Sequence, residues 1–115
     1  MFTGKNKEDF EKWYLITHCK TSMTYEELMP HHKQEVYGWF YDLKDSFKQG
    51  VYLEYLDSVG YVVDLSIIMG AEIERYFSYS IKFRNTIKVY CENKHTRQEA
   101  LKEAFKKADE LINSK

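Results

Sequence analysis

Three short runs of alternating apolar and polar residues, followed by a strongly periodic helix, fill residues 61–112 and constrain the fold more than any other feature. Alternation with period two predicts strands that have one buried and one solvent-facing side, as in an antiparallel sheet. Thr96-Arg97-Gln98-Glu99 has the form of a capping box and predicts a helix over about 97–112. This helix must cover one face of the sheet, and its opposite face carries Lys, Glu and Asp.

The alternation assigns each strand residue to one of two faces. The residues expected on the covered face are Tyr61, Val63, Leu65, Ile67, Ile73, Phe77, Tyr79, Ile81, Phe83, Ile87, Val89 and Cys91. Those expected on the wet face are Val62, Asp64, Ser66, Ile68, Glu74, Tyr76, Ser78, Ser80, Lys82, Lys88, Tyr90 and Glu92. Gly70-Ala71-Glu72 and Arg84-Asn85 predict the two turns that join the strands.

The N-terminal part of the chain is expected to be helical. Residues 6–17 have helical spacing, with Asn6 as a candidate N-cap. Pro30 limits any helix before it to about one turn and suits the first position of the next one. After Pro30, apolar residues at helical spacing predict a helix, a break near 42–45 and a second helix over about 44–59, which Gly60 ends. We therefore expect one α+β domain, with a helical region at 1–43 and an α-β-β-β-α core at 44–115.

Length and composition argue against several functional classes of protein. A chain of 115 residues is one domain by size, and a formal charge of −1 gives no bulk attraction to nucleic acid or anionic membranes. No apolar run reaches about 18 residues, so no membrane span is expected. Cys19 and Cys91 lie far apart, which favours reduced thiols and a cytoplasmic location.

No motif indicates catalysis, a cofactor or a metal. The chain contains no P-loop, GxGxxG or GxSxG sequence. None of the histidine and cysteine spacings is typical of a zinc site. These residues occur as His18-Cys19, His31-His32 and Cys91 with His95. We expect a protein that is not an enzyme and binds no metal or cofactor.

Aromatic residues, at 17%, are the one compositional excess. They fit either a core built from rings or an aromatic face for binding or oligomerisation. The candidate anchors for such a face are Trp39, Tyr41, Tyr76 and Tyr90. On the wet face of the sheet, tyrosines beside Lys82 and Lys88 could also stack a base and hold a phosphate, or form an ordinary solvated surface. Arg97, at the start of the last helix, could meet an anion.

Residues 44–112 resemble double-stranded RNA-binding domains in the order of their elements. In that family the last helix begins with a Lys-rich phosphate clamp. At the matching positions only Arg97 keeps the basic character, and Leu101 replaces a lysine-type position. The resemblance therefore implies a shared shape without most of the RNA-binding clamp.

A second resemblance covers nearly the whole chain. It is carried by Phe10-Glu11-Lys12-Trp13-Tyr14, by the stretch from Gln49 to Gly60, and by Thr96 to Ala100 running into Ala108 to Asn113. The chain is similar to a family of short, uncharacterised proteins of tailed phages and prophages of gut bacteria. This resemblance implies a phage accessory protein made in the host cytoplasm. Together with the small size, the tyrosine-rich composition and the lack of catalytic groups, it favours a protein that binds a host component, most simply a host protein, for example as an inhibitor of a defence system. The alternatives are a nucleic-acid or nucleotide binder and a homodimeric module.

Overall fold

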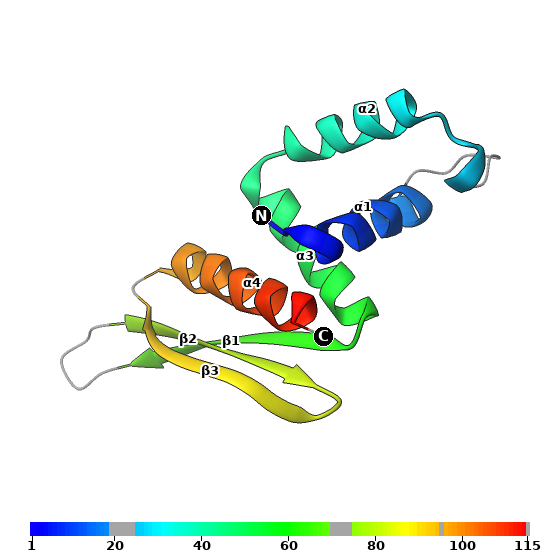
Figure 1. Ribbon diagram of the computed structural model, residues 1–115. Helices are drawn as coiled ribbons and strands as arrows, with labels where there is room; N and C mark the ends of the chain where they lie inside the picture. The colour runs from blue at the N-terminus through cyan, green and yellow to red at the C-terminus, as the bar shows by residue number, and fades with distance from the viewer. Residues whose placement is uncertain (19–24, 70–74, 95, 115) are drawn as a thin grey trace.

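The chain folds as four helices and one three-stranded antiparallel sheet (Figure 1). The computed structural model describes residues 1–18, 25–69, 75–94 and 96–114, with the backbone alone at 25, 68–69, 75–76 and 92–94. In chain order the elements are α1 (Gly4–His18), the 3-10 turn η1 (Tyr25–Glu27), α2 (Pro30–Tyr41), α3 (Asp45–Ser58), β1 (Tyr61–Met69), β2 (Arg75–Phe83), β3 (Thr86–Lys94) and α4 (Arg97–Asn113). The predicted α+β class and the α-β-β-β-α order are confirmed.

The sheet is a meander in the order β1-β2-β3. Both strand pairs are antiparallel, and Ile81 of β2 lies between Val63 of β1 and Val89 of β3. Arg84 and Asn85 have φ values of 51° and 65°, which is the backbone that a two-residue hairpin turn requires. The hairpin predicted there is confirmed, whereas the turn predicted at 70–72 and the positions of Ile73 and Glu74 lie outside the described residues.

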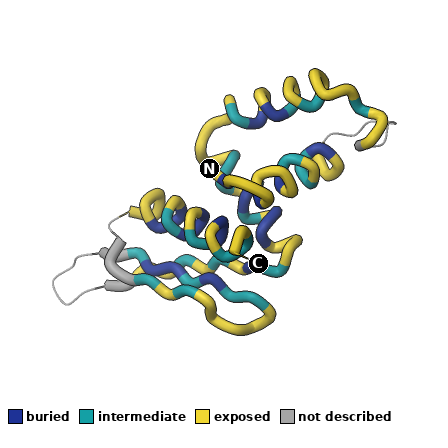
Figure 2. The backbone as a smooth tube through the Cα atoms, viewed as in Figure 1, coloured by how far each residue is buried: buried dark blue, intermediate teal, exposed yellow. Residues whose placement is uncertain are grey.

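One face of the sheet is covered by α4, which contacts all three strands, and by α3, which contacts β1. Ala104 and Phe105 of α4 and Ile81 of β2 are fully buried there. The Thr96 hydroxyl accepts a hydrogen bond of 3.1 Å from the Glu99 N–H, so the predicted N-cap is confirmed. Figure 2 shows the buried residues gathered on the inner sides of these layers.

A second part of the core consists of stacked and edge-on rings between the helices. The Phe2 ring packs edge-on against Tyr52, with 4.7 Å between centroids, and the Phe10 ring lies 5.2 Å from Phe40 of α2. The expected break in the helical region is also present, because α2 ends at Tyr41 and α3 begins at Asp45. The interpretation of the aromatic excess as core-forming rings holds for this part of the chain.

The turn from α3 into β1 depends on Gly60. Its φ of 92° is one that side-chain-bearing residues rarely adopt, and a Cβ there would lie 3.0 Å from the Phe83 ring. The predicted helix stop at this position is confirmed.

Five polar side chains form a cluster that ties the two ends of the chain together. This terminal polar cluster consists of Thr3, Asn6, Tyr55, Asp109 and Asn113. Asp109 accepts hydrogen bonds from the Thr3 N–H (3.0 Å), the Thr3 hydroxyl (2.7 Å) and the Asn6 amide (2.8 Å). The Asn6 carbonyl oxygen accepts from the Tyr55 hydroxyl at 2.7 Å.

Two expectations are corrected by this cluster. Asn6 does not cap α1, because the helix begins at Gly4 and the Asn6 side chain is fully buried between α3 and α4. Its N–H is instead satisfied by the Asn113 side chain at 3.0 Å. Asp109 does not lie on the solvent-facing side of α4, since it is only 6% exposed. Two of the free N–H groups at the start of α1, those of Thr3 and Asn6, are thus satisfied by the end of α4.

The molecule is elongated, with extents of 57 × 29 × 21 Å. Its radius of gyration is 16.2 Å, against roughly 13 Å for a compact domain of this length. In Figure 1, α1 and α2 lie at one end and the sheet lies at the other. This arrangement leaves the face of the sheet opposite α4 open to solvent.

Candidate functional site

The face of the sheet opposite α4 is open and presents side chains in a defined arrangement. Strand register places Val62, Lys82 and Ile87 side by side in one row across β1, β2 and β3. Asp64, Ser80 and Tyr90 form the next row in the same order. We call these six residues the open-face patch.

A β-bulge brings Ile87 into the patch. Val89 pairs with Ile81, but Ile87 pairs with the next residue of β2, Lys82, so that β3 contains one extra residue, Lys88. An extra residue shifts the alternation of side chains and turns the following ones to the other face. Ile87 was expected on the covered face with Val89. That expectation is wrong, and the bulge is the reason.

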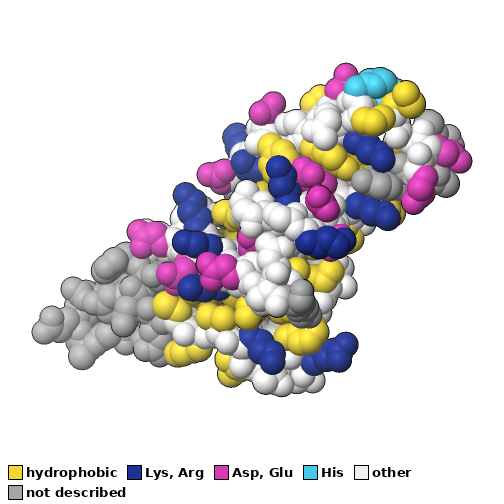
Figure 3. Space-filling view, viewed as in Figure 1, with side chains coloured by type: hydrophobic (Ala, Val, Ile, Leu, Met, Phe, Trp, Pro, Cys, Tyr) yellow, Lys and Arg dark blue, Asp and Glu magenta, His cyan; other side chains and the backbone are white. Residues whose placement is uncertain are grey.

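Apolar side chains of the patch are well exposed. Ile87 and Tyr90 are each 58% exposed and Val62 is 44% exposed. Lys82 lies between Val62 and Ile87, with its ammonium 3.5 Å from the Asp64 carboxylate, so that the charges of the patch balance. Figure 3 shows hydrophobic and basic side chains side by side over the sheet, at the bottom of the view. Exposed apolar groups around a neutral ion pair are typical of a protein-binding surface.

Two further strand residues differ from the alternation pattern. Ser78, expected on the wet face, is only 4% exposed, and it lies at a shift in the register between β2 and β3. Ile67, expected on the covered face, is 53% exposed near the end of the edge strand β1.

The predicted cationic residues do not form one site. Lys88 is exposed at the bulge, near the start of β3, whereas Arg97 is exposed at the start of α4, beyond the other end of that strand. At about 3.3 Å per residue, the six steps from Lys88 to Lys94 alone span roughly 20 Å. Lys82 is engaged by Asp64. Tyr76 lies on β2, and its side chain is outside the described residues.

The two aromatic anchors predicted on α2 have different environments. Trp39 is 66% exposed, whereas the Tyr41 hydroxyl donates a hydrogen bond of 3.0 Å to Glu11 of α1. Burial and the neighbouring Glu11 carboxylate raise the pKa of Tyr41 well above its usual range. Trp39 is therefore open to a partner, and Tyr41 is part of the α1–α2 contact.

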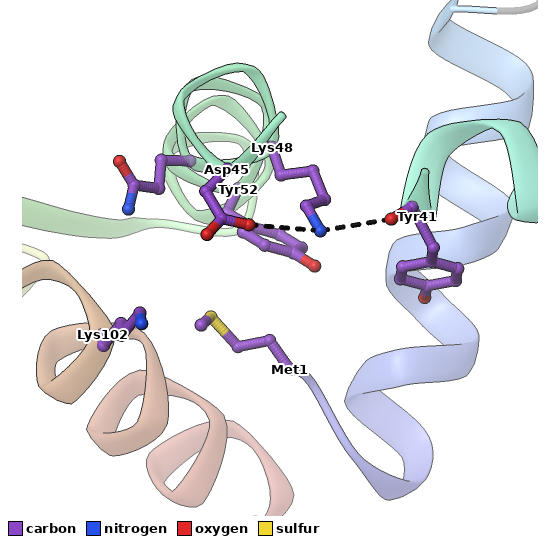
Figure 4. Close-up of a pocket in the computed structure, with 7 residues that line it drawn as sticks. Met1, Tyr41, Asp45, Lys48, Tyr52 and Lys102 are labelled. Atoms are coloured by element: carbon purple, nitrogen blue, oxygen red, sulfur yellow. Dashed lines mark hydrogen bonds and ion pairs between the residues drawn. The ribbon is translucent and has the colours of Figure 1, made fainter. Parts of the chain in front are cut away.

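A pocket of about 270 Å³ lies where α3, α4 and the start of the chain meet (Figure 4). It is lined by Met1, Tyr41, Asp45, Lys48, Gln49, Tyr52 and Lys102. The Lys48 ammonium lies 3.2 Å from the Tyr41 carbonyl oxygen and 3.4 Å from the Asp45 carboxylate, which fixes its position at one side. The sequence patterns indicated none of these residues except Tyr41, because the lining comes from separate helices.

The described histidines lie at the periphery. His18, at the end of α1, is 3.3 Å from Glu54, and the rings of His31 and His32 lie 4.0 Å apart at the start of α2. His95 and Cys19 lie outside the described residues. Within the described ranges, no three His, Cys, Asp or Glu side chains are grouped as metal ligands. Nor does this part of the chain include a helix that is long and apolar enough to cross a membrane.

No protein-family model, curated protein or solved structure matches the chain. The functional argument therefore depends on the open-face patch and the pocket.

Proposed function

We propose that the chain is a non-enzymatic binding protein that docks another protein on the open-face patch. The observation that carries this proposal is the bulge at Lys88, which turns Ile87 to the same face as Val62 and Tyr90. Keeping an isoleucine 58% exposed gains nothing for folding, whereas covering it in an interface removes apolar surface from water. Bulges commonly re-aim side chains beside binding sites.

The chemistry of the patch fits a protein partner. Tyrosine is enriched among the residues that dominate binding energy, and Tyr90 lies beside the small side chain of Ser80, in the row next to that of Val62 and Ile87. The Lys82–Asp64 pair offers polar contacts to an interface rim. Given the resemblance to phage accessory proteins, we propose a host protein as the partner, such as a component of a defence system in the host cytoplasm.

The test is photo-crosslinking to host lysate, with the crosslinker placed at Ser66 beside the patch. One discrete partner should be captured by the native chain. It should be lost when Ile87→Thr and Tyr90→Thr are combined, because threonine keeps the preference for a strand and removes the apolar contacts. Trp39→Ala is the matched control, since Trp39 is equally exposed but lies on α2. Capture that survives the double substitution, or is lost equally with Trp39→Ala, would rule out the patch.

Nucleic acid or a nucleotide has less support as the ligand. Lys82 is neutralised by Asp64, and Arg97 lies roughly 20 Å or more from Lys88, so the cations do not follow one phosphate backbone. A gel shift with duplex and single-stranded RNA distinguishes the two functions. A complex that weakens steeply with salt and is lost on Lys82→Glu with Lys88→Glu would favour nucleic acid over protein.

A second copy of the chain is the other partner that a specific observation favours. Bulges interrupt β3, but β1 pairs without interruption over nine residues and has Asp64 as its one charge. In the described part of the chain, its outer edge forms no backbone hydrogen bond to another segment. Unprotected edges pair readily with other strands. Two β1 strands paired antiparallel about Leu65 would bring Val63 opposite the partner's Ile67.

Light scattering over a range of concentrations tests this homodimer. We expect Ile67→Lys to produce a monomer, since a lysine on an edge strand opposes pairing. A native chain that is monomeric at every concentration would exclude β1 pairing without affecting the proposal for the open-face patch.

A further inference from the structure

The pocket between α3, α4 and the chain start has a tyrosine hydroxyl in its lining that bonds no other residue the structure describes. Tyr52 is only 4% exposed, and its ring packs within 5.4 Å of Phe105 and 4.7 Å of Phe2. Its hydroxyl has no hydrogen-bond partner among the described residues, although this residue lines the pocket and its hydroxyl is directed into it (Figure 4). Among the described residues no buried side-chain N or O atom lacks a partner, so this hydroxyl is reached by solvent through the pocket and is free to bond a water or a ligand.

Two lysines approach the same space from different helices. Lys48 of α3 is held by the Tyr41 carbonyl and by Asp45, and it keeps further donor capacity because an ammonium has three N–H groups. Lys102 of α4 also lines the pocket, is exposed, and has no acidic or hydrogen-bonding partner within the described residues. With Asp45 as the one acidic side chain, the lining has a net positive charge.

We infer that this pocket binds a small organic oxyanion, with a carboxylate or phosphate held by Lys48, Lys102 and the Tyr52 hydroxyl. The ring of Tyr52 and the Met1 side chain give the rest of the ligand an apolar wall. A volume of about 270 Å³ is slightly below that of drug-sized sites, which are roughly 300–1,000 Å³, so the ligand has about the size of one substituted ring.

The protonation state of Tyr52 suits this role. Burial, followed by the charge of Asp45, raises the pKa of Tyr52 to about 12, so the phenol keeps its proton at neutral pH and can donate a hydrogen bond to an anion. The site is independent of the open-face patch, because its residues lie on α2, α3, α4 and the chain start.

The experiment is an NMR titration of the ¹⁵N-labelled full chain with phenyl phosphate, benzoate and the neutral analogue benzamide. We expect saturable shifts at the amides of Lys48, Gln49, Tyr52 and Lys102 with one or both anions, and none with benzamide. Binding of phenyl phosphate alone identifies a phosphoryl ligand, and binding of benzoate alone identifies a carboxylate ligand. Equal shifts with benzamide, or no shifts at millimolar concentrations of either anion, would overturn the inference.

Three variants distinguish specific anion binding in the pocket from nonspecific attraction of anions to surface lysines. Tyr52→Phe keeps the core ring and should weaken anion binding by on the order of tenfold, the usual effect of losing one hydrogen bond to a charged group. Lys102→Gln should weaken it similarly, whereas Lys106→Gln, one turn further along α4 and outside the pocket, should not. Equal losses for the two lysine variants, or unchanged affinity in Tyr52→Phe with an unchanged melting temperature, would overturn the assignment.

Discussion

Replacing Asp109 with alanine should destabilise the protein far more than a typical change on the polar side of a helix. The Asp109 carboxylate accepts two hydrogen bonds from Thr3, at 3.0 and 2.7 Å, one from Asn6 at 2.8 Å and one from Asn113 at 3.1 Å. Asn6 is fully buried, so alanine at 109 leaves an amide N–H without a partner in the protein interior. An unsatisfied buried donor costs about 1–3 kcal/mol, and the lost bonds to a charged group add to it.

We therefore expect Asp109→Ala to lower the free energy of unfolding by about 3–5 kcal/mol, a large part of the roughly 5–15 kcal/mol of a typical domain. Urea denaturation followed by circular dichroism should show a midpoint lower by on the order of 2 M. Asp109→Asn keeps the shape and one acceptor, so its loss should be about half as large.

The matched control is Glu110→Ala, on the adjacent residue. Glu110 is exposed, and its carboxylate lies 3.6 Å from the Lys107 ammonium on the surface. Its removal should therefore change the free energy of unfolding by no more than about 0.5 kcal/mol. If Asp109→Ala and Glu110→Ala had similar effects, the cluster would not join the ends of the chain as described.

Three further changes have defined outcomes. Gly50→Ala should raise the free energy of unfolding by about 0.5–1 kcal/mol in a thermal melt, because α3 has open space at that Cβ and glycine disfavours a helix interior. Thr96→Ala should lower it by about 1 kcal/mol, and Thr96→Ser should restore it, since only the hydroxyl accepts from the start of α4. Burial raises the pKa values of Tyr52 and Tyr55 to about 12 from an ordinary 10. Stability should therefore fall as pH rises from 10 to 12, by up to about 1.4 kcal/mol per pH unit for each tyrosine, and Tyr52→Phe should reduce that slope in pH-dependent urea melts.

Local signals in the sequence were sufficient for most of the fold. Period-two alternation, the Arg84-Asn85 turn and the Thr96 cap each act through neighbouring residues. The strands at 61–69 and 75–83, the turn and the cap are confirmed, although Ile67 and Ser78 depart from the alternation. The helix stop at Gly60 is also a local signal, because it follows from the backbone geometry of that residue alone.

The structure differs from the sequence-based predictions at positions where residues far apart in the chain contact each other. Asn6 and Asp109 are more than 100 positions apart, so no local pattern could show that they bond. The sequence did contain one sign that Asp109 is buried. Asp109 follows Phe105 by four positions and therefore lies on the inward-facing stripe of α4. For Ile87 the strand composition gives no sign of the bulge, which depends on the register with β2.

The orientation of Ile87 is the most direct test of the proposed binding surface. Nuclear Overhauser contacts from the Ile87 methyl groups in the native chain report which face of the sheet they occupy. We predict contacts to the Lys82 side chain, its neighbour on the open face, and none to α4. Contacts from Ile87 to Leu111 or Ile112 of α4 would place it on the covered face and contradict the open-face patch.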